Sequence, residues 1–182
     1  LMEYTQGISR WVRVSGTAEE VESMRYVAGV LAGFGYETKL TLHPGFISVP
    51  VRASLELEAP EAIRCECITH SFAPSTPVTG LVGELVGRSS PAIEGKVVLT
   101  QGLPDSYEVL NLQKFGAKAV IFVQDECLHK YACSPIWGAP TEETEGLLPR
   151  IPVVSITRKE GAILEKFINH RPARVRIETV VD

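Results

Sequence analysis

The sequence predicts a mixed α/β fold, in which a small mixed sheet or open β-barrel is flanked by helices and preceded by an N-terminal helix and strand. Three observations lead to this fold class. Apolar residues alternate with other side chains over residues 46–86, which is typical of strands. After residue 96, short apolar runs alternate with amphipathic helical patterns. The length of 182 residues suits one domain, or one domain with an appendage.

The first element that we expect is a helix over residues 18–34. Thr17 and Glu20 have the spacing of a capping box, in which the hydroxyl and the carboxylate each accept a hydrogen bond from a free backbone N–H. One face of this helix is apolar, and Gly35 follows it as a C-terminal stop. Alternation over residues 36–42 then predicts a half-buried strand. The apolar stripe of the helix consists of Val21, Met24, Val27, Val30, Leu31 and Phe34.

His-Pro-Gly at residues 43–45 interrupts this pattern and predicts a domain boundary, with residues 1–45 as one part and residues 46–182 as the other. The second part begins with a mostly extended pattern. Its segments predict antiparallel strands joined by turns, and they cover residues 49–57, 63–69 and 80–86.

From residue 96 onward, strands and helices alternate. Asp105 caps a helix that ends at Gly116, and Thr157 with Glu160 forms a capping box that begins a second helix. Because strand, helix and strand follow one another at this spacing, we expect parallel pairing with a right-handed crossover. The expected strands cover residues 96–100, 119–123, 151–156 and 173–180.

Composition and charge argue against several classes of partner. The 18 basic and 22 acidic residues give a net charge of −4, whereas nucleic-acid and anionic-membrane surfaces require concentrated Lys and Arg. The longest fully apolar run, residues 119–123, is far shorter than the roughly 20 residues of a membrane-spanning helix. Since the chain begins with Leu1 rather than Met, we expect its natural N-terminus to lie upstream. The sequence leaves the compartment, cytoplasmic or secreted, open.

The spacing of the four cysteines favours free thiols. Cys65 and Cys67 lie two residues apart in an extended segment, which places them on one face. Neither they nor Cys127 and Cys133 form the CxxC pair of a structural zinc site. A disulfide between Cys127 and Cys133 is the alternative to free thiols.

No catalytic motif stands out in the sequence. It contains no glycine-rich phosphate loop and no HExxH motif, and its four histidines lie in separate contexts. Cys127 and His129, with Cys133 nearby, are the candidates for a nucleophile or a metal site, but a polar surface loop is the preferred interpretation. We therefore assign no catalytic residue and no cofactor to this chain.

Residues 124–150 form a long stretch without periodicity, and loops of such length are usually functional or disordered. Trp137, with Tyr131 and Ile136, is a candidate contact patch for a partner or substrate; alternatively, Trp137 folds back to anchor the loop. We expect this stretch to be the most mobile or most partner-engaged part of the chain. The candidate contact surface also includes three acidic residues, which we expect to be solvated rather than paired for catalysis: Glu142, Glu143 and Glu145.

Several segments resemble the protease-associated domain. An entry strand at residues 78–82 (VTGLV) is followed by residues 93–99 (IEGKVVL), which match the domain's "GKVVL" strand. The helix, Gly-Ala turn and strand of that domain are similar to residues 112–122 (LQKFGAKAVIF). Its closing signature resembles residues 151–156 (IPVVSI) with Gly161 and Leu164.

The beginning of the chain resembles the opening of di-zinc aminopeptidases of the glutamate carboxypeptidase II and transferrin receptor clan. The similar residues are 13–17 (RVSGT), Glu20 and 31–37 (LAGFGYE). In those proteins the protease-associated domain is inserted soon after this opening, and the segment with the zinc ligands follows the insert. The resemblance thus implies that residues 1–45 belong to a parent peptidase domain and residues 46–182 to its protease-associated domain, with zinc in the parent's catalytic domain.

A non-catalytic accessory role follows from this resemblance, in which the domain shapes substrate access or mediates protein contacts of the parent peptidase. The expected partners are the parent's catalytic domain and a peptide or protein substrate. Alternatives are the same domain from another protease or a sorting receptor, a free-standing ligand-binding module, and a free-standing enzyme that uses Cys127 and His129.

The apolar stripe of the first helix needs a covering partner, since burial of each such side chain is worth roughly 1.5–3 kcal/mol. The resemblance implies that this partner is the sheet of the parent's catalytic domain. Without that sheet, we expect the stripe to pair with a second copy and form a homodimer, in preference to docking on the protease-associated domain of its own chain.

Overall fold

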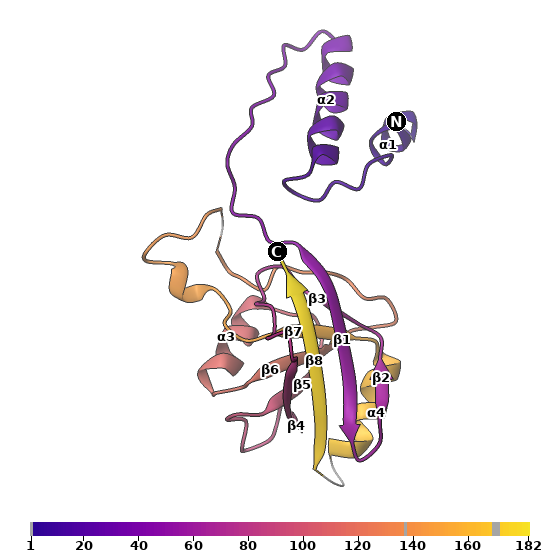
Figure 1. Ribbon diagram of the computed structural model, residues 1–182. Coiled ribbons are helices and arrows are strands. Elements are labelled where there is room, and N and C mark those ends of the chain that lie inside the picture. Colours follow the sequence, from indigo (N-terminus) through magenta and orange to yellow (C-terminus); the bar gives the residue numbers. More distant parts are fainter. Residues whose placement is uncertain (1, 137, 169–171) are drawn as a thin grey trace. The chain divides into compact units, whose positions relative to one another are not determined.

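The computed structural model describes residues 2–136, 138–168 and 172–182, and the chain divides into two compact units, Leu1–Ile47 and Ser48–Asp182 (Figure 1). Within the described ranges, no helix is both long enough and apolar enough to cross a membrane.

The first unit holds two helices, α1 (Met2–Ile8) and α2 (Ala18–Gly33). The predicted capping box begins α2, because the N–H of Glu20 donates to the Thr17 hydroxyl at 3.3 Å and the Glu20 carboxylate accepts from the N–H of Gly16 at 2.7 Å. Helix α1 was not predicted. It packs on α2 through an edge-to-face contact between Tyr4 and Phe34, whose ring centroids lie 5.7 Å apart.

The strand predicted over residues 36–42 is wrong. The chain has no regular secondary structure there, and Tyr36, Leu40 and Leu42 are exposed. A strand needs a neighbour that pairs with its backbone N–H and C=O groups, and the described part of this unit contains helices and irregular segments only. The alternating pattern therefore marks a segment that has no partner strand within its own unit.

The second unit is built around one eight-stranded sheet with the order β2-β1-β8-β4-β5-β6-β7-β3. Strands β4 to β7 are parallel to one another, whereas β8 pairs antiparallel with β1 and β4. The mixed α/β fold class is thus confirmed. The strands are β1 (Pro50–Ala59), β2 (Ile63–Cys65), β3 (Cys67–Thr69), β4 (Leu81–Gly87), β5 (Val97–Gln101), β6 (Ala119–Val123), β7 (Val153–Ile156) and β8 (Ala173–Val181).

The expectation that the strands before residue 87 pair antiparallel holds for only one side of β4, which is antiparallel to β8 but parallel to β5. Residues 88–96 return the chain to the end of the sheet at which β4 begins, so β5 runs in the same direction. The other strands of this half do pair antiparallel: β1 with β2 and β8, and β3 with β7.

The sheet is not closed into a barrel, although both of its edge strands come from one short stretch of chain. Strand β2 pairs with β1 at one edge, and β3 pairs with β7 at the other. Only Glu66 separates the two strands, and its N–H donates to the Glu160 carboxylate at 3.2 Å. The sheet therefore curls until its two edges meet at this residue.

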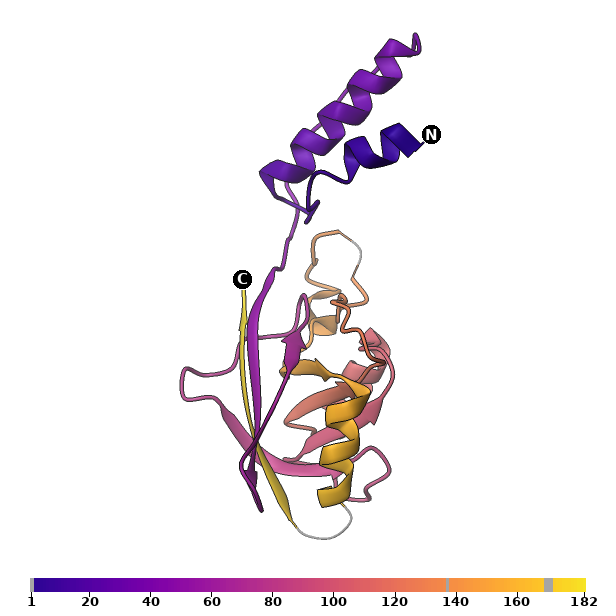
Figure 2. The ribbon, with the colours of Figure 1, turned by 90° about the vertical axis from the view of Figure 1, so that its right-hand side faces the viewer.

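Two helices, α3 (Ser106–Lys114) and α4 (Arg158–Ile168), cover opposite faces of the sheet (Figure 2). Successive side chains of β6 point to opposite faces. Ile121 packs in the core cluster that contains Leu164 of α4, whereas Phe122 packs in the cluster that contains Leu112 of α3. Both helices thus begin where a parallel strand ends, α3 on one face of the sheet and α4 on the other.

Both helices begin at the caps that the sequence predicts. The Asp105 carboxylate accepts the N–H groups of Tyr107 and Glu108, each at 3.0 Å. The Glu160 carboxylate accepts the N–H of Thr157 at 3.1 Å and also contacts the Thr157 hydroxyl. These caps fix where each helix starts relative to the strand before it.

Candidate functional site

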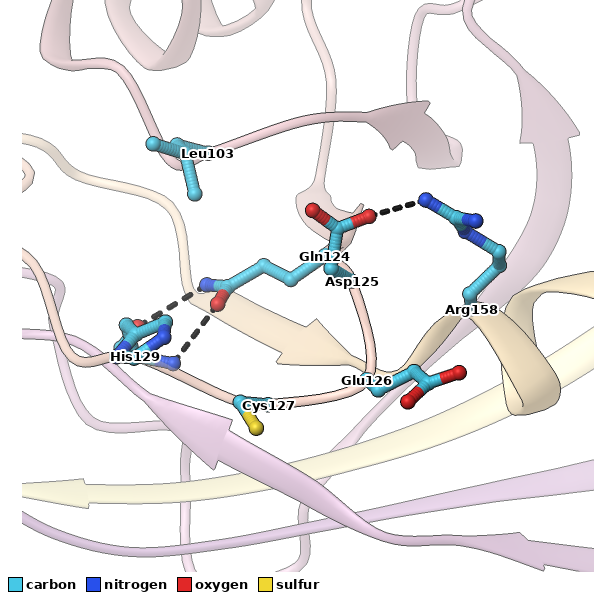
Figure 3. A pocket seen from close by; sticks show the side chains of 7 residues that line it. All are labelled: Leu103, Gln124, Asp125, Glu126, Cys127, His129 and Arg158. Atoms are coloured by element: carbon cyan, nitrogen blue, oxygen red, sulfur yellow. Dashed lines mark hydrogen bonds and ion pairs between the residues drawn. The ribbon is translucent and has the colours of Figure 1, made fainter.

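A pocket of about 400 Å³ lies where the parallel strands β5, β6 and β7 end (Figure 3). Its lining comes from the segments that follow these strands, and the carboxyl ends of parallel strands are the usual place for ligand sites in α/β sheets. The lining residues are Leu103, Gln124, Asp125, Glu126, Cys127, His129 and Arg158.

Gln124 holds the loop that forms one wall of this pocket. Its side-chain carbonyl accepts the N–H of His129 at 2.8 Å, and its amide donates to the carbonyl of His129 at 3.0 Å and to the Ser155 hydroxyl at 2.8 Å (Figure 3 shows the two bonds to His129). Gln124 is buried. Because these bonds occupy both ends of the amide, it positions the loop and is not available to a ligand.

The remaining polar groups of the pocket do not converge on one point. Asp125 and Arg158 form an ion pair whose side chains are 81% and 73% exposed, and such exposed pairs contribute little energy. In Figure 3 the Cys127 thiol points away from the His129 ring. The fold thus brings the two candidate residues for a nucleophilic pair into one pocket without directing them at each other.

Cys133 lies apart from this pocket. It is completely buried in the core cluster that contains Val120 and Ile151, and burial raises the pKa of its thiol to about 12. All four cysteines are free thiols. Among the residues that the structure describes, no group of three or more His, Cys, Asp or Glu side chains is placed to hold a metal ion. The donor set of Cys127, His129 and Cys133 therefore does not fit zinc.

A buried polar network that was not predicted from the sequence joins His70, Gln124, Tyr131 and Ser155. Nε2 of His70 lies 2.8 Å from the Ser155 hydroxyl, and Nδ1 of His70 accepts the N–H of Tyr131 at 3.2 Å. His70 and Ser155 are completely buried. The available signal was Ser155 itself, because a hydroxyl inside an otherwise apolar buried strand needs hydrogen-bond partners.

His70 is uncharged at neutral pH in this setting. Burial lowers its pKa to about 4 from 6.5, and the nearby positive charge of Lys130 acts in the same direction. Its role is therefore that of a neutral hydrogen-bonding group.

The first part of the predicted loop is attached to the sheet. The N–H of Ser71 donates to the Tyr131 carbonyl at 3.0 Å, and the N–H of Cys133 donates to the Ser71 carbonyl at 2.9 Å. The Lys130 ammonium donates to the carbonyl of Pro50 at 2.9 Å. Residues 129–133, called the 129–133 segment below, are thus a packed element, and the outer part of the stretch begins after them.

The predicted contact residues lie at or beyond this attachment. Tyr131 is 36% exposed and Ile136 is half-buried. Trp137 lies outside the described residues. The three predicted acidic residues are exposed, and the last of them begins a short 3-10 helix, η1 (Glu145–Leu147): Glu142, Glu143 and Glu145.

The first unit offers a different kind of surface, an apolar groove of about 280 Å³ between α1 and α2. The predicted stripe of α2 is not buried within this unit, since Met24, Leu31 and Phe34 are 38%, 40% and 60% exposed. The groove is lined by Tyr4, Thr5, Ile8, Tyr26, Val27, Val30 and Leu31. This surface suits an apolar partner.

Comparison with solved structures gives peptidases that share this fold. An aminopeptidase from Aneurinibacillus sp. strain AM-1 matches with a TM-score of 0.68 and 20% identity, over 99% of this chain and 43% of that chain. A peptidase M28 precursor from Shewanella amazonensis SB2B matches with a TM-score of 0.72 and 13% identity, over 99% of this chain and 46% of that chain. The zinc aminopeptidase BSAP from Bacillus subtilis matches with a TM-score of 0.64 and 20% identity, over 93% and 39%.

This chain therefore spans less than half the length of the structures that it matches. No curated protein matches it by sequence. The family model of the PA domain, in contrast, matches residues 65–164. That range contains β3 to β7, α3 and the pocket at the ends of the parallel strands. The chain belongs to the PA domain family.

Proposed function

We propose that this chain is the accessory part of a zinc aminopeptidase. In this proposal residues 46–182 form the PA domain, and residues 1–45 belong to the peptidase domain of the same longer protein. Zinc and the catalytic residues, in this proposal, belong to that peptidase domain. The structural neighbours, two of which are aminopeptidases by name, support this class of parent.

The observation that carries the proposal is the uncovered apolar surface of the first unit. Leu31 of α2 and Phe34, directly after that helix, are exposed, and residues 36–42 have the pattern of a strand but no strand to pair with among the described residues of the unit. A helix face and an unpaired strand are what a neighbouring sheet would cover in a larger protein. The sheet of the peptidase domain is the covering partner that we propose.

Within that larger protein, Tyr131 together with the outer part of residues 124–150 is the surface that we propose for contact with peptide substrate. Tyr131 and Ile136 supply apolar area, and the exposed carboxylates beyond them would favour positively charged side chains of a bound peptide. The role of the PA domain is then to admit and orient substrate rather than to react with it.

The test uses the complete open reading frame that contains these residues. Hydrolysis of an aminoacyl p-nitroanilide and of a pentapeptide is measured for the unaltered protein and for Tyr131→Ala. We expect Tyr131→Ala to raise KM for the pentapeptide severalfold and to leave the small substrate unaffected, because only the longer substrate reaches the PA domain.

The matched control is Phe115→Ala, which removes an aromatic side chain that is 58% exposed at the C-terminal end of α3. It should change neither rate. An equal effect of Phe115→Ala would refute the contact surface, and absence of aminopeptidase activity from the zinc-loaded complete protein would refute the parent class.

A further inference from the structure

We propose that His70 is an acid-sensitive latch: protonation of its imidazole releases the 129–133 segment from the sheet. This inference concerns the second unit alone and does not depend on the identity of the parent protein. It rests on the hydrogen-bond geometry around the ring, on complete burial of the ring, and on the way in which the segment is attached.

The 129–133 segment is held at one point by the imidazole itself. The N–H of Tyr131 donates to Nδ1 of His70 at 3.2 Å. On either side of this bond, Ser71 exchanges backbone hydrogen bonds with Tyr131 and Cys133. A change at Nδ1 therefore acts at the centre of the attachment.

The two ring nitrogens have fixed roles in the closed state. Because Nδ1 accepts from a backbone N–H, it carries no proton, so the proton of the neutral ring must be on Nε2. Nε2 then donates to the Ser155 hydroxyl at 2.8 Å, and that hydroxyl also accepts from the amide of Gln124. This arrangement specifies one neutral tautomer.

A second proton on the ring has no acceptor in the closed state. It would sit on Nδ1 and face the N–H of Tyr131, which places two donors against each other. Among the described groups of this network, Ser155 of β7 and Gln124 are uncharged. The charged group that acts on the ring is Lys130, and its sign is unfavourable. Opening of the segment relieves both the donor clash and the repulsion.

The same network extends to the pocket. Gln124, which holds the loop of residues 124–129, shares the Ser155 hydroxyl with His70. Release of Tyr131 thus also removes support from the wall of the pocket and from the contact residues that follow. Acid would loosen this face of the domain while the sheet beneath it stays folded.

The experiment is amide hydrogen exchange by NMR on the 182-residue chain at pH 7.5 and pH 5.0, with rates converted to protection factors. The pKa of His70 is about 4 in the closed state and 6.5 as the ordinary value. The protection factor of the Tyr131 amide should therefore fall about 25-fold between these two pH values. The amide of Ile121, in the centre of the sheet, reports global unfolding, so it should be better protected than the Tyr131 amide at both pH values.

The variant His70→Asn is the matched control. Its side-chain oxygen lies near the position of Nδ1 and can accept from Tyr131, but it does not titrate in this range. In this variant the protection factor of Tyr131 should not depend on pH. If the variant does not fold, the ¹⁵N shifts of His70 in the unaltered chain report the tautomer, and a proton on Nδ1 at pH 7.5 would overturn the proposal. So would an unchanged protection factor at Tyr131, or equal protection factors at Tyr131 and Ile121, because both amides would then exchange only through global unfolding.

Discussion

Helix α2 in the first unit and helix α4 in the second differ in what covers their apolar faces. On α4, Leu164 is completely buried in a core that also contains Ile121 and Ile177. On α2, Leu31 is 40% exposed, and the buried residue of the helix is the small polar Ser23. Both helices carry apolar residues at three- and four-residue spacing. The comparison teaches that such a pattern identifies the face that must be covered, but not whether the covering element is in the same unit.

The strongest test of this comparison is the same substitution in both helices. Leu164→Ala should destabilise the chain by about 2–5 kcal/mol, because it leaves a cavity in a close-packed core. Leu31→Ala should cost about 1 kcal/mol or less, since its side chain is already partly solvated. Urea unfolding followed by circular dichroism measures both. Equal costs would mean that α2 is as well covered as α4.

A second difference is that the second unit contains a buried histidine. Below pH 6.5 the unfolded chain takes up a proton at His70, whereas the folded chain does so only near its lowered pKa of about 4. Stability is therefore fully present above pH 6.5 and falls as the pH drops through this window, by about 2 kcal/mol between pH 7.5 and pH 5.0. Urea unfolding at the two pH values measures this loss. His70→Asn should remove that share of the pH dependence.

Removal of the first unit tests whether the second unit is stable by itself and whether the first unit causes self-association. A chain that starts at Ser48 keeps the entire sheet, so its free energy of unfolding should change by less than about 1 kcal/mol. The full chain should sediment as a homodimer through the exposed face of α2, and the shorter chain as a monomer. Monomers in both cases would refute the dimer, and a dimer of the shorter chain would place the interface on the PA domain.

The smallest effect is expected at the mouth of the pocket. Asp125→Asn removes the ion pair with Arg158, whose side chains are largely exposed. The free energy of unfolding should fall by less than about 0.5 kcal/mol. A loss of more than about 1 kcal/mol in the free energy of unfolding would indicate that this ion pair stabilises the start of α4.

Much of the second unit could be predicted from local chemistry. The caps at Asp105 and Thr157 follow from side chains that satisfy free N–H groups nearby in sequence. Such features depend on a few neighbouring residues, and the sequence contains them all.

The features that were not predicted depend on partners far away in the chain. The network of His70, Ser155 and Gln124 joins three segments that only the fold brings together. The strand predicted over residues 36–42 failed for the opposite reason, because its pattern is correct for a strand while its unit supplies no neighbour. The pocket likewise combines segments that follow three different strands, so sequence spacing alone identified Cys127 and His129 but not their orientation.

The interruption at Glu66 has a consequence for the behaviour of this domain in solution. Exposed edge strands are templates on which other chains can add strands and aggregate. Here the outermost strands, β2 and β3, contain three residues each, and the chain crosses from one edge to the other through Glu66. The N–H of that residue is already bonded to the Glu160 carboxylate. Because β2 and β3 are this short and are joined by a single residue, they offer few free backbone N–H and C=O groups to an added strand.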